Sequence, residues 1–197
     1  MIPPASPRAA WPDGGGRLLL VGMMGAGKTS VGTRIAQLTG WPYLDNDDLL
    51  RASTGSTPRQ LIARDGIDRL HQAEAELLTV ISAAPAPLVA SVAASLVEAP
   101  GAPQRLIATG VVVYLRAAPD TLVARVTEAG PGSATGHRPW VDTEGPEVVI
   151  GLLDRRDRLY EQVADLVVDT DAIDPGQVAR VILHWLPGRA TPDLQRP

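Results

Sequence analysis

Gly22-Met23-Met24-Gly25-Ala26-Gly27-Lys28-Thr29 is the stretch that decides the fold. It follows a short apolar run at residues 17–22 and leads into a helical pattern at residues 29–38. A glycine-rich loop of this spacing, between a buried strand and a helix and ending in Lys-Thr, is typical of a phosphate-binding site. Its backbone N–H groups and the positive end of the helix attract phosphate oxygens. We therefore expect a nucleotide to bind at Gly25, Ala26, Gly27, Lys28, Thr29 and Ser30.

Lys28 is the single lysine of the chain, beside seventeen arginines. A bias against lysine runs through the whole sequence, so a lysine at this position indicates a function. We expect its ammonium group to reach the terminal phosphates and the Thr29 hydroxyl to bind Mg²⁺. The alternative is a chance glycine-rich loop, which the flanking strand and helix disfavour.

Outside the loop, short apolar runs alternate with helical patterns. This alternation predicts an α/β fold with three α/β/α layers around a five-stranded parallel sheet. We expect strands at residues 17–22, 43–45, 88–92, 111–115 and 166–168, and helices at residues 29–38, 47–52, 66–82, 119–128, 147–162 and 175–185, with one more helix beginning at Thr57-Pro58.

Length and composition indicate one globular domain. The 197 residues are 45% hydrophobic and 20% charged, with a net charge of −4. The absence of cysteine excludes disulfides, Cys-ligated metal sites and thiol catalysis. We expect a single domain at residues 17–186, preceded by a disordered lead-in at residues 1–16 and followed by a disordered tail at residues 187–197. No signal peptide, membrane span or basic surface is evident, so we expect a cytoplasmic protein that binds neither nucleic acid nor membrane. We also expect a monomer.

Ligands of parallel α/β folds bind beyond the carboxyl ends of the strands. That edge holds residues 22–29, 45–47, 93–95 and 116–118. Asp45 and Asp47 lie there, where one carboxylate could take a proton from a substrate hydroxyl and another could orient a metal's water shell. A solvated acidic helix N-terminus is the alternative interpretation.

Three further groups carry polar side chains worth testing. His71 and Glu74 are three residues apart, so they share a helix face and can touch. The alternative is an ordinary surface pair on an amphipathic helix. Arg138 lies in a polar, glycine-rich segment at about residues 130–145, which we expect to be a mobile lid that closes over phosphate; a solvated loop arginine is the alternative. Arg155, Arg156 and Arg158 form either a solvated helix face or a source of one arginine for the cleft.

Together these motifs resemble the shikimate kinases, small P-loop kinases of the nucleoside-monophosphate-kinase-like fold that use ATP and Mg²⁺. The similarity runs over residues 17–186. It is carried by the loop at 22–32, by Tyr43-Leu44-Asp45-Asn46-Asp47, and by Val112-Val113-Tyr114-Leu115, Arg138-Pro139, Arg155-Arg156 with Leu159-Tyr160, and Val168-Asp169-Thr170-Asp171.

The resemblance implies a role for each matching residue. Lys28 and Thr29 would serve phosphate and metal, with Asp45 near the metal. Asp47 would bind the substrate hydroxyls and act as base, and Arg138 would cover the phosphates. On the acceptor side the matching positions are Glu74, Arg156 and the wall at Ala93, Ala94 and Ser95, and on the adenine side they are Arg125 and Pro175.

Two positions depart from the family pattern, both on the acceptor side. His71 stands where the family has an arginine for the substrate carboxylate, and an imidazole cannot replace a bidentate guanidinium. Ala93-Ala94-Ser95 stands in place of three glycines. The resemblance thus predicts an ATP-dependent kinase whose first candidate acceptor is shikimate. Another cyclitol or sugar acid, or a nucleotide-binding relative without catalysis, is the alternative.

Overall fold

Five parallel strands form one sheet in the computed structural model, which describes residues 16–128, 145 and 147–186. The order across the sheet is β2-β3-β1-β4-β5, so the glycine loop follows the central strand. This confirms the predicted α/β fold class. The strands are β1 (Arg17–Val21), β2 (Tyr43–Leu44), β3 (Leu88–Ser91), β4 (Val111–Arg116) and β5 (Leu166–Asp169).

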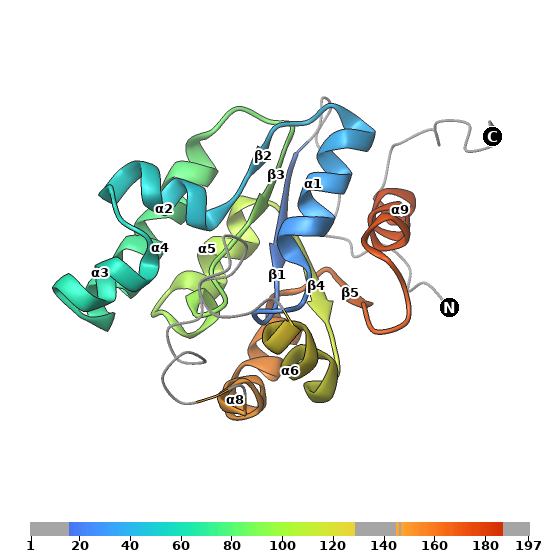
Figure 1. Ribbon diagram of the computed structural model, residues 1–197. Helices are drawn as coiled ribbons and strands as arrows, with labels where there is room; N and C mark the ends of the chain where they lie inside the picture. The colour runs from blue at the N-terminus through green and yellow to red at the C-terminus, as the bar shows by residue number, and fades with distance from the viewer. Residues whose placement is uncertain (1–15, 129–144, 146, 187–197) are drawn as a thin grey trace.

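Helices cover both faces of the sheet (Figure 1). They are α1 (Lys28–Thr39), α2 (Asn46–Thr54), α3 (Pro58–Asp65), α4 (Ile67–Ala83), the 3₁₀ helix η2 (Leu96–Glu98), α5 (Ala102–Thr109), α6 (Pro119–Glu128), α8 (Val148–Val163) and α9 (Pro175–Trp185). Helix α1 packs against α9 on one side, while α5 and α8 contact β4 on the other. Helices α2, α3 and α4 gather beside the β2 edge (Figure 1).

Most elements begin and end within two residues of the predicted bounds, because the apolar periods that define them are local. No element is predicted above for residues 96–110, yet η2 and α5 lie there. Pro100 and Pro103 with Gly101 are typical of a loop, but Pro103 lies in the first turn of α5, where its missing N–H costs no hydrogen bond.

Two hydrophobic clusters support these elements. The larger one joins the sheet to its covering helices, and strands β1, β3 and β4 are buried almost throughout. The smaller one lies among α2, α3 and α4 and consists of Leu50, Leu61, Leu70, Ala73 and Leu77. Leu78 and Ile81, on the last turns of α4, belong to the larger cluster.

Some predictions concern residues beyond the described ranges. The tail, Arg138, and nearly all of the lead-in and of the lid segment at 130–145 lie outside the described residues. In the part of the chain that the structure describes, none of the helices has the length and apolar character needed to cross a membrane.

Two helical glycines give a matched test of the packing around Tyr43. A Cβ on Gly32, in α1, would lie 2.2 Å from Tyr43 Cε2, whereas a Cβ on Gly151, in α8, would have no described atom beyond its own helix backbone within 4 Å. Both changes to alanine gain helix propensity, about 1 kcal/mol in a helix interior. We expect Gly151→Ala to raise the free energy of unfolding and Gly32→Ala to lower it by about 1–3 kcal/mol through overpacking. Denaturant unfolding of both variants checks this, and a stabilising Gly32→Ala would contradict the packing described.

Candidate active site

One cavity of about 420 Å³ opens at the carboxyl ends of the strands. Its size is that of an ordinary small-molecule site. It brings together residues from the glycine loop, the start of α2, β3, α4, α6, α8 and α9. The sequence-predicted residues that line it are Gly25, Ala26, Gly27, Lys28, Thr29, Ser30, Asp45, Asp47, Glu74, Ala93, Ala94, Ser95, Arg125, Arg156 and Pro175.

The glycine loop depends on glycine for its path. Gly25 and Gly27 have φ values of 81° and 90°, in the left-handed region that other residues rarely adopt. At Gly22, a Cβ would lie 2.5 Å from the backbone oxygen of Leu115. The loop therefore lies directly against the end of β4, and α1 begins at Lys28 with no side chain capping its first N–H groups. Those N–H groups are left for an anion.

Lys28 folds back over the loop. Its Nζ donates to the backbone oxygens of Gly22 at 2.8 Å and Met23 at 3.0 Å. Burial of the ammonium lowers the pKa of Lys28 to about 8, although Asp47 and Asp45 act in the opposite direction. The group is thus a cation held beside the phosphate-binding backbone at neutral pH.

Asp45 is the centre of a hydrogen-bond cluster between three elements. Its Oδ2 accepts from Thr29 Oγ1 at 3.0 Å, from the Tyr43 hydroxyl at 2.7 Å and from Ser91 Oγ at 3.1 Å. Its Oδ1 accepts from the Asp47 backbone N–H at 2.9 Å and so caps α2. Burial alone raises the pKa of Asp45, but these hydrogen bonds outweigh it and hold the pKa below its ordinary value.

Asp47 has a different environment from Asp45. Its described side-chain hydrogen bond is a long one, 3.4 Å from Asn46 Nδ2. Burial, and then the charge of Asp45, raise the pKa of Asp47, while Lys28 opposes them. Of the two carboxylates, Asp47 is therefore the better proton acceptor, and Asp45 remains ionised.

Glu74 faces the cavity from α4 and is buried. It accepts a hydrogen bond of 2.5 Å from Ser95 Oγ. Burial raises the pKa of Glu74 to about 7, with Asp47 adding to the effect and Ser95 opposing it. Ser95, one of the residues that replace the family's glycines, thus has a role of its own here: its hydroxyl fixes the Glu74 carboxyl.

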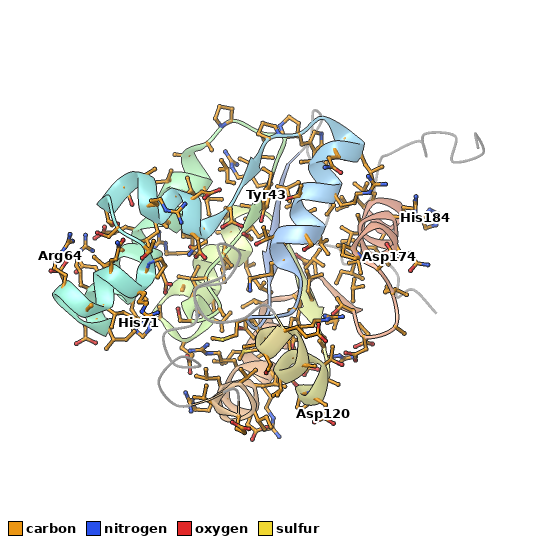
Figure 2. All side chains as sticks on the ribbon, viewed as in Figure 1. Tyr43, Arg64, His71, Asp120, Asp174 and His184 are labelled. Atoms are coloured by element: carbon orange, nitrogen blue, oxygen red, sulfur yellow. The ribbon has the colours of Figure 1, made fainter. Side chains whose placement is uncertain are left out.

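Arg156 enters the same part of the cavity from α8 and is 3% exposed. Its Nε donates to Glu98 Oε2 at 2.6 Å. His71 does not line the cavity, although it lies three residues before Glu74. Figure 2 shows His71 within the α2–α4 group, whereas Tyr43 lies beside α1. Burial, and next the charge of Arg156, lower the pKa of His71, so its imidazole is neutral at pH 7.

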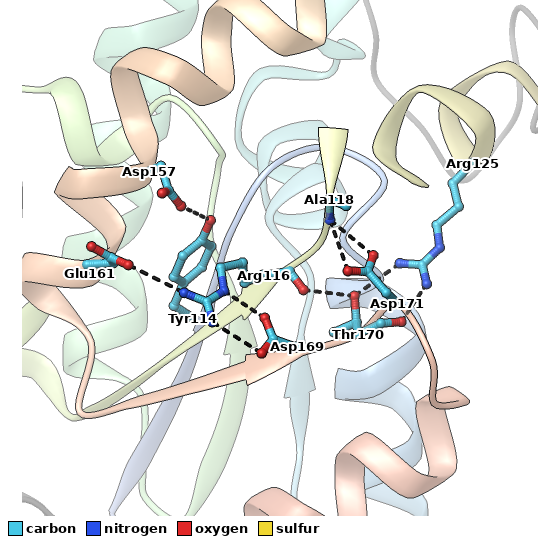
Figure 3. A network of polar contacts seen from close by, with 9 residues as sticks. All are labelled: Tyr114, Arg116, Ala118, Arg125, Asp157, Glu161, Asp169, Thr170 and Asp171. Carbon is cyan, nitrogen blue, oxygen red and sulfur yellow. Dashed lines mark hydrogen bonds and ion pairs between the residues drawn. The ribbon is translucent and has the colours of Figure 1, made fainter. Parts of the chain in front are cut away.

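The opposite end of the cavity is organised by Arg125 (Figure 3). Its guanidinium donates to the Thr170 backbone oxygen at 2.6 Å, to Thr170 Oγ1 at 3.1 Å and to the Gly25 backbone oxygen at 3.4 Å. Pro175 follows Asp174, which caps α9 in a reciprocal pair with Gln177. This end places an arginine and a proline next to the glycine loop.

Several cavity residues escaped the sequence analysis. Thr170, Ile173 and Val178 line the cavity, as does Ser91. Thr170 lies within Val168-Asp169-Thr170-Asp171, one of the stretches that carry the family resemblance. That resemblance is the signal that could have identified Thr170 as a site residue. Residues 116–118, expected at this edge, line a separate hollow instead. There Arg116 forms an ion pair with Asp169, 2.6 Å from Nε to Oδ1 (Figure 3), and Asp171 accepts from the Ala118 backbone N–H.

The pKa of Lys28, about 8, predicts a pH-dependent affinity for ADP. Below that pH the ammonium is charged and attracts phosphate; above it the free protein must first take up a proton, so affinity falls between about pH 7 and pH 9. Lys28→Ala should weaken ADP binding at pH 7 about ten- to a hundredfold and flatten this dependence.

Isothermal titration calorimetry at both pH values measures the effect. Lys28→Arg is the matched control, because arginine stays charged over this range; it should bind ADP with little change between the two pH values. Equal affinity of wild type and Lys28→Ala would show that the lysine does not contact phosphate.

The raised pKa of Glu74 predicts an effect on stability. In the unfolded chain the carboxyl ionises near 4.5, but in the folded protein it stays protonated up to about pH 7. This group therefore lowers the free energy of unfolding as pH rises between those two values, and no further above them. Glu74→Gln removes the ionisation and keeps an acceptor for Ser95, so it should stabilise the protein more at about pH 8 than at about pH 5.

Denaturant unfolding at the two pH values checks this. Glu76→Gln is the control, because Glu76 lies on the same helix with its side chain 57% exposed. If both glutamine variants respond to pH alike, Glu74 is not a buried, neutral carboxyl.

Known proteins are similar to this chain in sequence and in fold. The shikimate kinase family model matches residues 24–187. A shikimate kinase of Thermodesulfovibrio yellowstonii is 31% identical over 167 residues, which cover 84% of this chain and 92% of that protein. One from Halorhodospira halophila is 33% identical over 174 residues, 88% of this chain and 94% of its own length.

Solved structures agree with the sequence matches. The shikimate kinase from Acinetobacter baumannii, solved in complex with shikimate, superposes with a TM-score of 0.79 at 29% identity, over 87% of this chain and 93% of that one. A gluconokinase from Sinorhizobium meliloti has a TM-score of 0.52 at 23% identity, over 87% of this chain and 91% of its own, and shares the fold alone. The family match over most of the chain and the relatives above 30% identity lead to one conclusion: the chain belongs to the shikimate kinase family, phosphotransferases that use ATP and act on a hydroxyl group.

Proposed function

We propose that this protein transfers the γ-phosphoryl group of ATP to a hydroxyl group of shikimate. The observation that carries the proposal is that a single cavity joins the phosphate-binding loop to Asp47, Glu74 and Arg156. Phosphate and acceptor ligands would therefore meet in one place. The relative from Acinetobacter baumannii, solved with shikimate bound, supports shikimate as that acceptor.

The nucleotide half of the cavity supplies positive charge. The backbone N–H groups of the loop would hold the phosphates, and Lys28 would move from the loop's carbonyl oxygens to the phosphate oxygens. Arg125 and Pro175 would flank the adenine. Arg138, outside the described residues, is proposed from the family resemblance to cover the phosphates.

The residues near Thr29 suit Mg²⁺. Among the described residues, no group of three or more His, Asp or Glu side chains could hold a metal by itself. Mg²⁺ in phosphoryl-transfer sites needs only one or two protein oxygens in addition to phosphates and water. Because the Thr29 hydroxyl donates a hydrogen bond to Asp45, the lone pairs of the hydroxyl oxygen remain available to coordinate a cation. Bound there, Mg²⁺ would offset the charge of the phosphates.

Asp47 is the proposed base. A hydroxyl proton of the acceptor would pass to a carboxylate oxygen of Asp47 as the acceptor oxygen bonds to the γ-phosphorus. The bond from that phosphorus to the β–γ bridging oxygen would break, and ADP would leave. The raised pKa of Asp47 favours this step, because a stronger base accepts the proton more readily.

Arg156 is the proposed partner of the acceptor's carboxylate. It is a buried guanidinium that faces the cavity, and guanidinium groups bind carboxylates through two parallel hydrogen bonds. His71, where the family has a second arginine, lies off the cavity lining and is neutral at pH 7. We therefore propose that Arg156 binds the carboxylate without that second guanidinium.

A coupled assay of ADP release with shikimate, quinate and gluconate as acceptors tests the function. Shikimate-dependent turnover is expected. Turnover with a different acceptor alone would replace shikimate in the proposal, and ADP binding without any turnover would indicate a relative that has lost catalysis.

Asp47→Asn should lower kcat about a hundredfold or more, because removal of a general base costs typically 10²–10⁴ in rate. Asp48→Asn is the matched control, because this neighbouring carboxylate is 78% exposed and pairs with Arg51. The kcat of Asp48→Asn should stay near that of wild type. Similar kcat values for the two variants would remove Asp47 from the mechanism.

A further inference from the structure

Arg156 is held by a carboxylate that is more exposed than the arginine itself. Its Nε donates to Glu98 Oε2 at 2.6 Å, and the arginine side chain is 3% exposed against 34% for Glu98. Among the described residues, Glu98 is the only carboxylate that forms an ion pair with Arg156. A buried guanidinium without such a partner is costly, so this pair determines how the arginine is held.

Glu98 occupies a particular place in the fold. It is the last residue of η2, three residues after Ser95, which with Ala93 and Ala94 forms a wall of the cavity. Its other described ion pair is with Arg155, at 3.6 Å, whose side chain is 62% exposed. An exposed pair at this distance contributes little. Glu98 therefore acts chiefly on Arg156.

Helix α8 meets the same segment at a second point. Tyr160, one helical turn after Arg156, donates from its hydroxyl to the Ala94 backbone oxygen at 2.6 Å. Tyr160 is fully buried and stacks on Tyr114 with ring centroids 4.8 Å apart. Two successive turns of α8 are thus fastened to residues 94–98, so the cavity wall and the arginine are held in register.

We infer that Glu98 is a positioning residue for the acceptor site: by accepting from Nε of Arg156 it orients the guanidinium at the cavity, where the guanidinium meets the carboxylate of the acceptor. The inference rests on the proposed function, because it concerns that carboxylate. Glu98 compensates for the missing second arginine at His71 by pre-organising the arginine that remains. An arginine that is already oriented loses less side-chain freedom on binding.

Steady-state kinetics of Glu98→Ala, Glu98→Gln and Arg155→Ala test the inference. Glu98→Ala should raise KM for shikimate about tenfold or more, the usual cost of a lost charge-assisted hydrogen bond, with KM for ATP changed less than about twofold. Glu98→Gln keeps an acceptor oxygen for Nε, so it should recover part of the loss. Arg155→Ala, the control that breaks only the exposed pair, should leave both KM values near wild type.

A double-mutant cycle with Arg156→Ala separates positioning from general damage. If Glu98 acts through Arg156, Glu98→Ala should add little to the KM for shikimate once Arg156 is alanine. Additive effects, or equal losses in Arg155→Ala and Glu98→Ala, would overturn the inference. Thermal unfolding of each variant shows whether it is folded. If Glu98→Ala does not fold, Glu98→Gln takes its place in the cycle.

The Nε–H resonance of Arg156 in NMR gives a measurement that needs no substrate. A strong hydrogen bond shifts this resonance and slows its exchange with water, and both signs should be lost in Glu98→Ala. An unchanged resonance overturns the inference whatever the substrate. A changed resonance together with a shikimate KM that Arg156→Ala does not raise would confirm the Glu98 contact and refute the proposal that Arg156 binds the acceptor's carboxylate.

Discussion

The carboxylate of Asp45 joins the parts of the molecule on which the site depends. One oxygen caps α2, which begins the helical group beside the β2 edge, and the other gathers hydroxyl groups from α1, β2 and β3. Because a side-chain carboxylate can accept several hydrogen bonds at once, one residue can couple the phosphate loop to the acceptor half. An apolar side chain at this position would leave the hydroxyl donors without their shared acceptor.

The same cluster separates the two neighbouring aspartates by function. Asp45 has its negative charge stabilised by four hydrogen bonds, whereas Asp47 is half-buried beside that charge and, among the described residues, its side chain accepts one long hydrogen bond. The pKa values of the pair therefore move in opposite directions, which is how one site obtains both a permanent anion and a base. Glu74, buried and hydrogen-bonded to Ser95, adds a third carboxyl, whose pKa is raised to about 7.

The sequence predicts the nucleotide half far better than the acceptor half. The loop at residues 22–29 needs glycine, lysine and threonine at fixed spacing, and its context is the strand and helix on either side, so a local pattern is sufficient. The partners of Arg156 are different: Glu98 lies 58 residues away along the chain, and no pattern around either residue announces the contact. His71 shares a helix face with Glu74 by spacing, yet spacing does not decide which residues of a face reach a cavity.

Helix α4 is built into both hydrophobic clusters at once. Its first half, with Leu70, Ala73 and Leu77, packs with α2 and α3, and its last turns, with Leu78 and Ile81, pack under the sheet. Glu74 lies on the first half. The carboxyl that faces the acceptor side of the cavity is therefore held in place by apolar packing between α4 and the helices α2 and α3, although none of the residues of the smaller cluster lines the cavity itself.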